Sequence, residues 1–168
     1  HTKPSYTITD GSFATGEGLT SATFAATSAI TNAGSVANTI TGVTPKDGTQ
    51  ENDYAFTYKA GTLTITNATF SVTLTGGSWT YNGGAHSATL TGTQSSDTIE
   101  YRTSTNGGTT WSTWSSTKPS VTHVSDGPMQ VQVKVSRANY NDATASATLT
   151  ITKQAIELTA DSGSWTYD

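Results

Sequence analysis

The chain has 168 residues, a formal net charge of −4, 33% hydrophobic and 12% charged residues, and no cysteine. Its charge content is about half the ~25% usual for soluble proteins, so it offers no basic surface to nucleic acid. No apolar run reaches the ~18 residues that a membrane span needs, which excludes membrane insertion. The absence of cysteine excludes a disulfide scaffold, a thiolate nucleophile and cysteine-ligated zinc. Thr and Ser make up 57 residues, and because Thr is β-branched this composition predicts β structure.

Alternating apolar and polar residues, bounded by turn residues, predict short strands along the whole chain. In the first half we expect strands at residues 5–9, 21–28, 35–43, 54–59 and 62–66, with turns at Asp10-Gly11, Asp47-Gly48 and Ala60-Gly61. In the second half we expect strands at 70–74, 80–81, 88–91, 98–104, 109–114, 129–136 and 143–151. Asn106-Gly107 predicts a hairpin with a type I′ turn, because both central residues of that turn need positive φ.

An internal repeat organises the chain. Residues 63–82 read LTITNATFSVTLTGGSWTYN and residues 149–168 read LTITKQAIELTADSGSWTYD, with ten of the twenty positions identical at an offset of 86 and no gap. Self-similarity at a fixed period is the signature of repeated structural units. We therefore expect two homologous units of about 85 residues.

The units are cut out of phase. The second unit opens with GSWTYNGGAHSATL at residues 77–90, whereas nothing like SWTY precedes His1, and residues 163–168 repeat this opening with no unit after it. Three residues equivalent to 83–85, placed after Asp168, would lead straight into His1. We expect a first module at residues 1–66 that lacks its opening strand, a second at 67–152, and the opening strand of a following module at 153–168. The short joint at residues 67–69 predicts a semi-rigid rod.

Several ordered motifs resemble one family. The run AGSVANTI at residues 33–40, the Asp53-Tyr54 pair, GTLTIT at 61–66 and the SWTY opening are similar to the bacterial surface repeats called MBG domains. The resemblance implies extracellular tandem modules of Gram-positive-type adhesins, secreted or held at the cell surface. It also implies a β-grasp or immunoglobulin-like fold. We expect an all-β chain of two small tandem β-sandwich or β-grasp-like modules in an elongated rod.

The missing and surplus strands predict how copies join. An incomplete unit leaves an open sheet edge and an unfilled core, which is unfavourable for a small domain. The segment from residue 156 to 167 could fill this space in another copy, either within a continuous polypeptide or by strand donation between subunits. We expect Trp165 and Tyr167 to pack over residues 4–8 of the following copy. The residues expected at this joint are Ile156, Leu158, Trp165, Tyr167, Pro4, Tyr6 and Ile8.

Other candidate sites have simpler explanations. Trp111 and Trp114 could stack on sugar rings, although three positions apart on a strand they would point to opposite faces. Trp79 and Trp165 recur at the same repeat position, which favours a core role. Lys59, Lys134 and Gln132 lie in expected strands and could form internal covalent crosslinks, or simply face outward.

No catalytic or metal-binding pattern stands out. Asp47, Glu51 and Asp53 could bind calcium, but their spacing departs from an EF-hand loop and a solvated loop explains them better. The three histidines are scattered, without a second ligand at zinc spacing. No nucleophile elbow, phosphate-binding loop or carboxylate pair appears, so we expect neither an enzyme nor a cofactor.

Two functions remain open. One is a structural stalk or filament whose partners are further copies of the chain. The alternative is an adhesin module that binds host or environmental glycans.

Overall fold

A computed structural model describes residues 1–167; Asp168, the last residue of the segment expected to open a following module, lies outside it. The prediction of an all-β chain is confirmed: these residues form ten strands and two single-turn 3-10 helices. None of these helices is long and apolar enough to cross a membrane. Contacts divide the chain into two units. The first unit comprises His1–Ala68 with Asn139–Asn141, and the second comprises Thr69–Ala138 with the chain from Asp142 onward.

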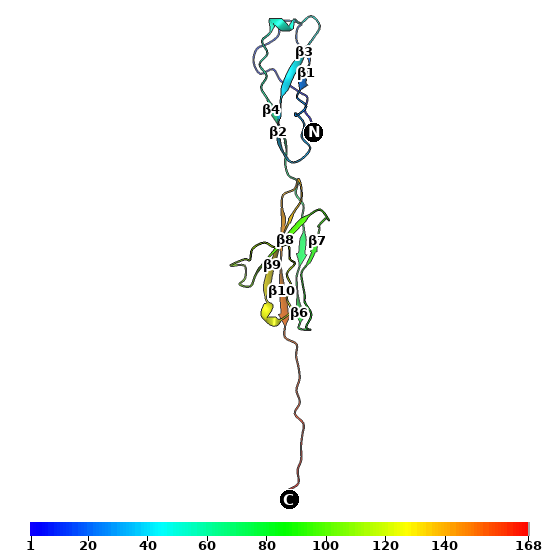
Figure 1. Cartoon of the computed structure of the whole chain (residues 1–168), viewed down its shortest axis with the longest axis vertical. Coiled ribbons are helices and arrows are strands. Elements are labelled where there is room, and N and C mark those ends of the chain that lie inside the picture. The colour runs from blue at the N-terminus through cyan, green and yellow to red at the C-terminus, as the bar shows by residue number, and fades with distance from the viewer. Residues whose placement is uncertain (168) are drawn as a thin grey trace. The chain divides into compact units, whose positions relative to one another are not determined.

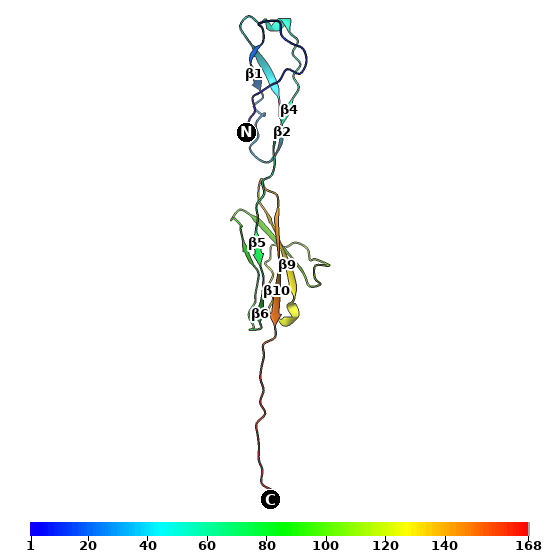
Figure 2. The same cartoon turned by 180° about the vertical axis from the view of Figure 1, so that it is seen from behind.

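The second unit is built on a four-stranded sheet. In spatial order its strands are β6 (Gly77–Thr80), β10 (Ala143–Thr152), β9 (Met129–Ser136) and β8 (Thr98–Ser104). β10 lies between its two neighbours (Figure 2), antiparallel to β9 and parallel to β6. A second ladder joins β5 (Thr73–Thr75) to β7 (Thr89–Thr91), and a 3-10 helix, η2 (Val124–Asp126), precedes β9.

The core of the second unit follows from alternation along the sheet. The β9 sequence MQVQVKVS turns Val131, Val133 and Val135 inward, each at most 1% exposed, because successive strand residues face opposite sides. Leu149 and Ile151 of β10 join them at 0% and 3%. Further buried members are Leu74, Ala88, Tyr101 and Val121, and the partly buried side chains packed on this core include Phe70, Val72 and Trp79.

The first unit has two separate antiparallel ladders. One joins β1 (Leu19–Phe24) to β3 (Ile40–Pro45), and the other joins β2 (Gly34–Asn38) to β4 (Gly61–Ile65). A 3-10 helix, η1 (Glu51–Asp53), lies between β3 and β4. The strand predicted at residues 35–43 is thus divided between β2 and β3, which pair with different partners. The predicted turn at Ala60-Gly61 falls where β4 begins.

Three predicted strands are wrong: residues 5–9, 54–59 and 109–114 belong to no strand. The first two line opposite sides of a groove described below, where neither has a partner strand to complete a ladder. Residues 109–114 follow a loop that Asn106 organises, since its Oδ1 accepts the N–H of Thr110 at 3.0 Å. Positive φ falls on Gly107 and Gly108, one residue later than the predicted type I′ turn requires.

Candidate functional site

β4 of the first unit and β10 of the second occupy equivalent places in their sheets. Leu63 of β4 is opposite Val36, and Leu149 of β10 is opposite Met129, in antiparallel ladders of the same kind. Residues 63–66 and 149–152 share the sequence LTIT. The other edge of β10 carries β6, whereas β2 is the only strand that pairs with β4 among residues 1–167. The first unit therefore has a free strand edge where the second has a fourth strand.

Burial differs accordingly between equivalent side chains. Leu149 and Ile151 are buried, but Leu63 and Ile65 are only half-buried. Of the eleven buried hydrophobic residues in the part of the chain that the structure describes, ten lie in the second unit and one, Ile30, in the first. Within the described residues, the first unit therefore buries far fewer apolar side chains than the second.

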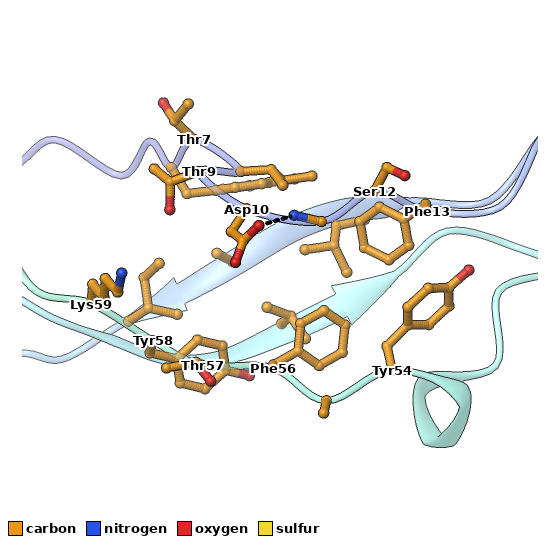
Figure 3. Close-up of a pocket in the computed structure, with 18 residues that line it drawn as sticks. Thr7, Thr9, Asp10, Ser12, Phe13, Tyr54, Phe56, Thr57, Tyr58 and Lys59 are labelled. Carbon is orange, nitrogen blue, oxygen red and sulfur yellow. Dashed lines mark hydrogen bonds between the residues drawn. The ribbon is translucent and has the colours of Figure 1, made fainter.

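A groove of about 430 Å³ marks the unfilled part of the first unit. Residues 6–13 form one wall and residues 54–59 form the other (Figure 3). The floor is made of apolar side chains from β1 and β3, namely Leu19, Ala22, Ile40 and Val43. In the second unit, β5 pairs with β7 and contacts β10. Residues 54–59 of the groove wall correspond, at the offset of 86, to residues 140–145, which lead into and begin β10.

Aromatic rings line the groove. The rings of Phe13 and Tyr54 lie 4.7 Å apart between centroids, and Phe56 and Tyr58 continue the row, with their centroids 6.4 Å apart. The Tyr54 hydroxyl accepts the N–H of Ala14 at 3.0 Å and donates to the carboxylate of Glu17. The hydrogen bond to Glu17 raises the pKa of Tyr54 above its ordinary value of 10.0. These bonds hold the wall of residues 54–58 to the loop before β1.

The last residues of the second unit form an exposed, extended segment. After β10, residues 153–167 belong to no strand, and the chain runs away from the sheet of this unit (Figure 1). The exposed fractions of Ile156, Leu158, Trp165 and Tyr167 are 79%, 91%, 90% and 99%. Their counterparts at an offset of 86 are Phe70, Val72, Trp79 and Tyr81, and the first three of these pack on the core of the second unit. We name residues 156–167 the tail.

The remaining residues expected at the joint lie in two places. Tyr6 and Ile8 line the groove and are 37% and 51% exposed. Pro4 lines a separate, smaller hollow of about 250 Å³ beside Phe24. Sequence reasoning did not single out the aromatic wall as a site. Its signal was the aromatic residue at every second position of 54–58.

The prediction that Trp111 and Trp114 point to opposite faces is wrong. They lie outside any strand, and the guanidinium carbon of Arg102 is 4.9 Å from the ring centroid of Trp111 and 4.6 Å from that of Trp114. The ammonium of Lys134 lies 5.0 Å from the Trp114 ring and also pairs with Glu100 at 2.7 Å. Both half-buried rings therefore gather over the outward cations of β8 and β9.

The acidic loop does not form a metal centre. Within residues 1–167, no three His, Cys, Asp or Glu side chains converge closely enough to hold a metal ion. Asp47, Glu51 and Asp53, the weak calcium candidates, are therefore not gathered into a site.

Comparisons of the chain with models of known protein families, with curated proteins and with solved structures give no match.

Proposed function

We propose that the chain is a structural repeat of an extracellular stalk or filament, whose copies join head to tail. In this proposal the tail of one copy completes the first unit of the next. One observation supports it above all. The same chain carries both an exposed, extended apolar segment, the tail, and an open groove lined by aromatic rings that could receive such a segment.

The tail exposes large apolar side chains that a packed strand would bury. Ile156, Leu158 and Trp165 are at least 79% exposed, and burying side chains of this size contributes about 1.5–3 kcal/mol each. Contiguous exposed apolar surface marks sites of association in soluble proteins. An extended segment that adds to a free sheet edge gains main-chain hydrogen bonds, while pockets select its alternate side chains.

The first unit has the properties of an acceptor. A domain of fewer than about 70 residues has little core to spare, so a sheet edge left uncovered exposes a large share of it. The half-buried Leu63 and Ile65 and the groove lined by Phe13 and Phe56 supply apolar surface for the tail. The free edge of β4 supplies unpaired backbone groups.

The extracellular setting rests on composition and on the resemblance to MBG repeats. A surface rich in Thr and Ser, with few charges and no cysteine, suits a module that spaces other groups apart and does not respond to thiol chemistry.

Self-association of the full chain tests the proposal. We expect sedimentation and electron microscopy to show linear assemblies whose size grows with protein concentration. Leu158→Asp places a charge on the tail face that enters the groove, and it should abolish assembly. Thr159→Asp places the same charge on the opposite face, because neighbouring strand residues alternate, and it should leave assembly intact. A wild-type chain that stays monomeric at high concentration would contradict the proposal.

A mixing experiment separates the two partners. Ile8→Asp places a charge in the groove at a position that is already 51% exposed, so the fold should tolerate it. Each variant alone, Leu158→Asp or Ile8→Asp, should remain monomeric. Mixed together they should form dimers and nothing larger, because one supplies the only free groove and the other the only free tail.

Glycan binding through Trp111 and Trp114 is the second candidate function. The contact of both rings with the Arg102 guanidinium favours it, since it holds the two indoles near one another and two such rings can contact one sugar chain. A glycan array should then show binding that Trp111→Ala removes. Assembly, by contrast, should not depend on Trp111.

A further inference from the structure

The second unit contains a template for the proposed joint. β6 pairs in parallel with β10, with Gly77 opposite Leu149 and Trp79 opposite Ile151. The sequence GSWTY of residues 77–81 recurs at 163–167, and LTIT of residues 149–152 recurs at 63–66. The two partners of this parallel pair are thus both present a second time, one in the tail and one on the free edge of β4.

The histidine on which the Trp79 indole stacks also has a counterpart in the first unit. The Trp79 indole stacks on the His86 imidazole, with ring centroids 4.7 Å apart and an interplanar angle of 17°. His86 is fixed because it exchanges two backbone hydrogen bonds with Val121, at 2.8 and 2.9 Å. His1 exchanges the same pair of bonds with Ile30, at 2.9 and 2.5 Å. Ile30 is buried, as Val121 is.

The tail already has the local shape of β6. A Cβ on Gly77 would lie 2.8 Å from Cζ2 of Trp79, so this indole folds over the glycine two residues before it. A Cβ on Gly163 would lie 2.5 Å from Cη2 of Trp165. The two Gly-Ser-Trp segments therefore present their indoles in the same way, one paired and one exposed.

From these observations we propose how the tail pairs with the acceptor strand: its direction and its register. This proposal rests on the proposed function above. Residues 163–166 of one copy pair in parallel with residues 63–66 of a second copy. Trp165 lies opposite Ile65, and its indole stacks on the imidazole of His1. This arrangement places the indole beside His1, whereas the sequence analysis expected it over residues 4–8.

The inferred register begins at Gly163 for a steric reason. Gly76 precedes β6 and lies so close to β10 that a Cβ there would be 2.2 Å from the carbonyl oxygen of Thr148. The tail has Ser162 at this position. The Cβ of Ser162 requires this residue to lie farther from the acceptor strand than Gly76 lies from β10, so close pairing of the tail with that strand begins at residue 163.

Engineered disulfides test the register, because the chain contains no cysteine of its own. Thr64→Cys with Ser164→Cys corresponds to the pair Thr150 and Ser78 of the template. Aligned residues on paired strands lie within the Cα separation of about 4.4–6.8 Å that a disulfide needs. The matched control, Thr62→Cys with Ser164→Cys, uses the same strand face but shifts the pair by two residues, or about 6.6 Å along the strand. Oxidation should link copies of the first variant into a covalent ladder and leave the control largely unlinked.

The outcomes separate the register from the proposed function, because sedimentation reports assembly whether or not disulfides form. Copies that assemble but crosslink through the control pair would overturn the register and leave the filament proposal standing. A disulfide that forms within a monomer would overturn the assignment of a second copy. Copies that neither assemble nor crosslink would overturn both.

The stacking on His1 has its own test. His1→Ala should weaken assembly severalfold without changing which cysteine pair crosslinks, because it removes the indole's platform and leaves the strand edge intact. Thr2→Ala, at an exposed neighbouring position, should have no effect. Unchanged assembly of the His1→Ala variant would overturn the stacking.

Discussion

Arg137 holds the carboxylate of Asp97 at two points, with Nε donating to Oδ1 and Nη2 donating to Oδ2, each at 2.8 Å. The exposed fractions of the two side chains are 12% and 0%. Thr98 and Ser136 form the terminal pair of the β8–β9 ladder, so this ion pair joins the next residue on each side and closes the end of the ladder. The bonds from Arg137, with one from the N–H of Gln94, lower the pKa of Asp97 from 3.8 to about 2.

Asp97→Asn should make the free energy of unfolding of the second unit less dependent on pH in the acidic range. A carboxyl group with a lowered folded-state pKa stabilises the fold above its unfolded-state pKa, and that stabilisation is lost as the pH falls through the folded-state value. The variant should unfold more easily than the wild type at pH 7, and the difference should shrink between about pH 4 and pH 2. Urea titration followed by tryptophan fluorescence measures this, because all four tryptophans lie in the second unit. Asp142→Asn, at an exposed position, is the matched control for the loss of one carboxylate.

Leu149→Ala and Leu63→Ala remove the same side chain from equivalent strands with different burial. Leu149 is fully buried, so its truncation should lower the free energy of unfolding of the second unit by about 2–5 kcal/mol. Leu63 is half-buried, and its truncation should cost the monomer less than half as much. Thermal unfolding followed by circular dichroism checks both values. Equal costs in the monomer would show that the first unit has a complete core.

Tyr54→Phe should loosen the aromatic wall of the groove. It removes the hydroxyl that accepts the N–H of Ala14 and donates to the carboxylate of Glu17, which should lower the stability of the first unit. The hydrogen bond to Glu17 raises the pKa of Tyr54, so its stabilising effect is present below pH 10 and is lost as the pH rises through the folded-state value. Ultraviolet titration of tyrosinate should show one late-titrating tyrosine fewer in the variant, with Tyr101, whose pKa is raised by burial, unaffected.

Gly76→Ala should separate the strand pair that serves as the template for the joint. Its Cβ would meet the carbonyl oxygen of Thr148, and overpacking of this kind costs about 1–3 kcal/mol. Trp79 should become more exposed, and tryptophan fluorescence should shift to longer wavelength. Gly42→Ala is a suitable control, since nothing lies within 4 Å of its added Cβ. An unshifted emission spectrum in Gly76→Ala would contradict the close approach of β6 to β10.

The sequence predicted the strands of the second unit better than those of the first. The bounds expected for β8 and β9 match the structure, because long alternating runs there pair with each other through a complete ladder. Residues 54–59 alternate just as clearly but form no strand. Alternation indicates that a segment is extended and which side is apolar, whereas a ladder also requires a partner strand.

The residues of the candidate site differ in whether the sequence alone points to them. The repeat phase predicts the tail, Tyr6 and Ile8 as residues of a joint, and in the structure the tail is exposed and Tyr6 and Ile8 line the groove. The wall that contains Phe13 and Tyr54 was missed, because residues 41 positions apart come together only through the tertiary fold. The stacking of Trp79 on His86, which supports the inferred register, has no local sequence signal either, because it depends on the tertiary fold.

The open groove and the exposed tail have a consequence for any assembly they form. In the proposed joint each copy uses one of each, so an open linear assembly of any length would keep one unfilled groove at one end and one uncovered tail at the other. The two ends therefore differ chemically, and such a filament has a direction. A molecule that mimics the tail would block only the first end, and one that mimics the groove would block only the second, so growth at each end could be stopped independently.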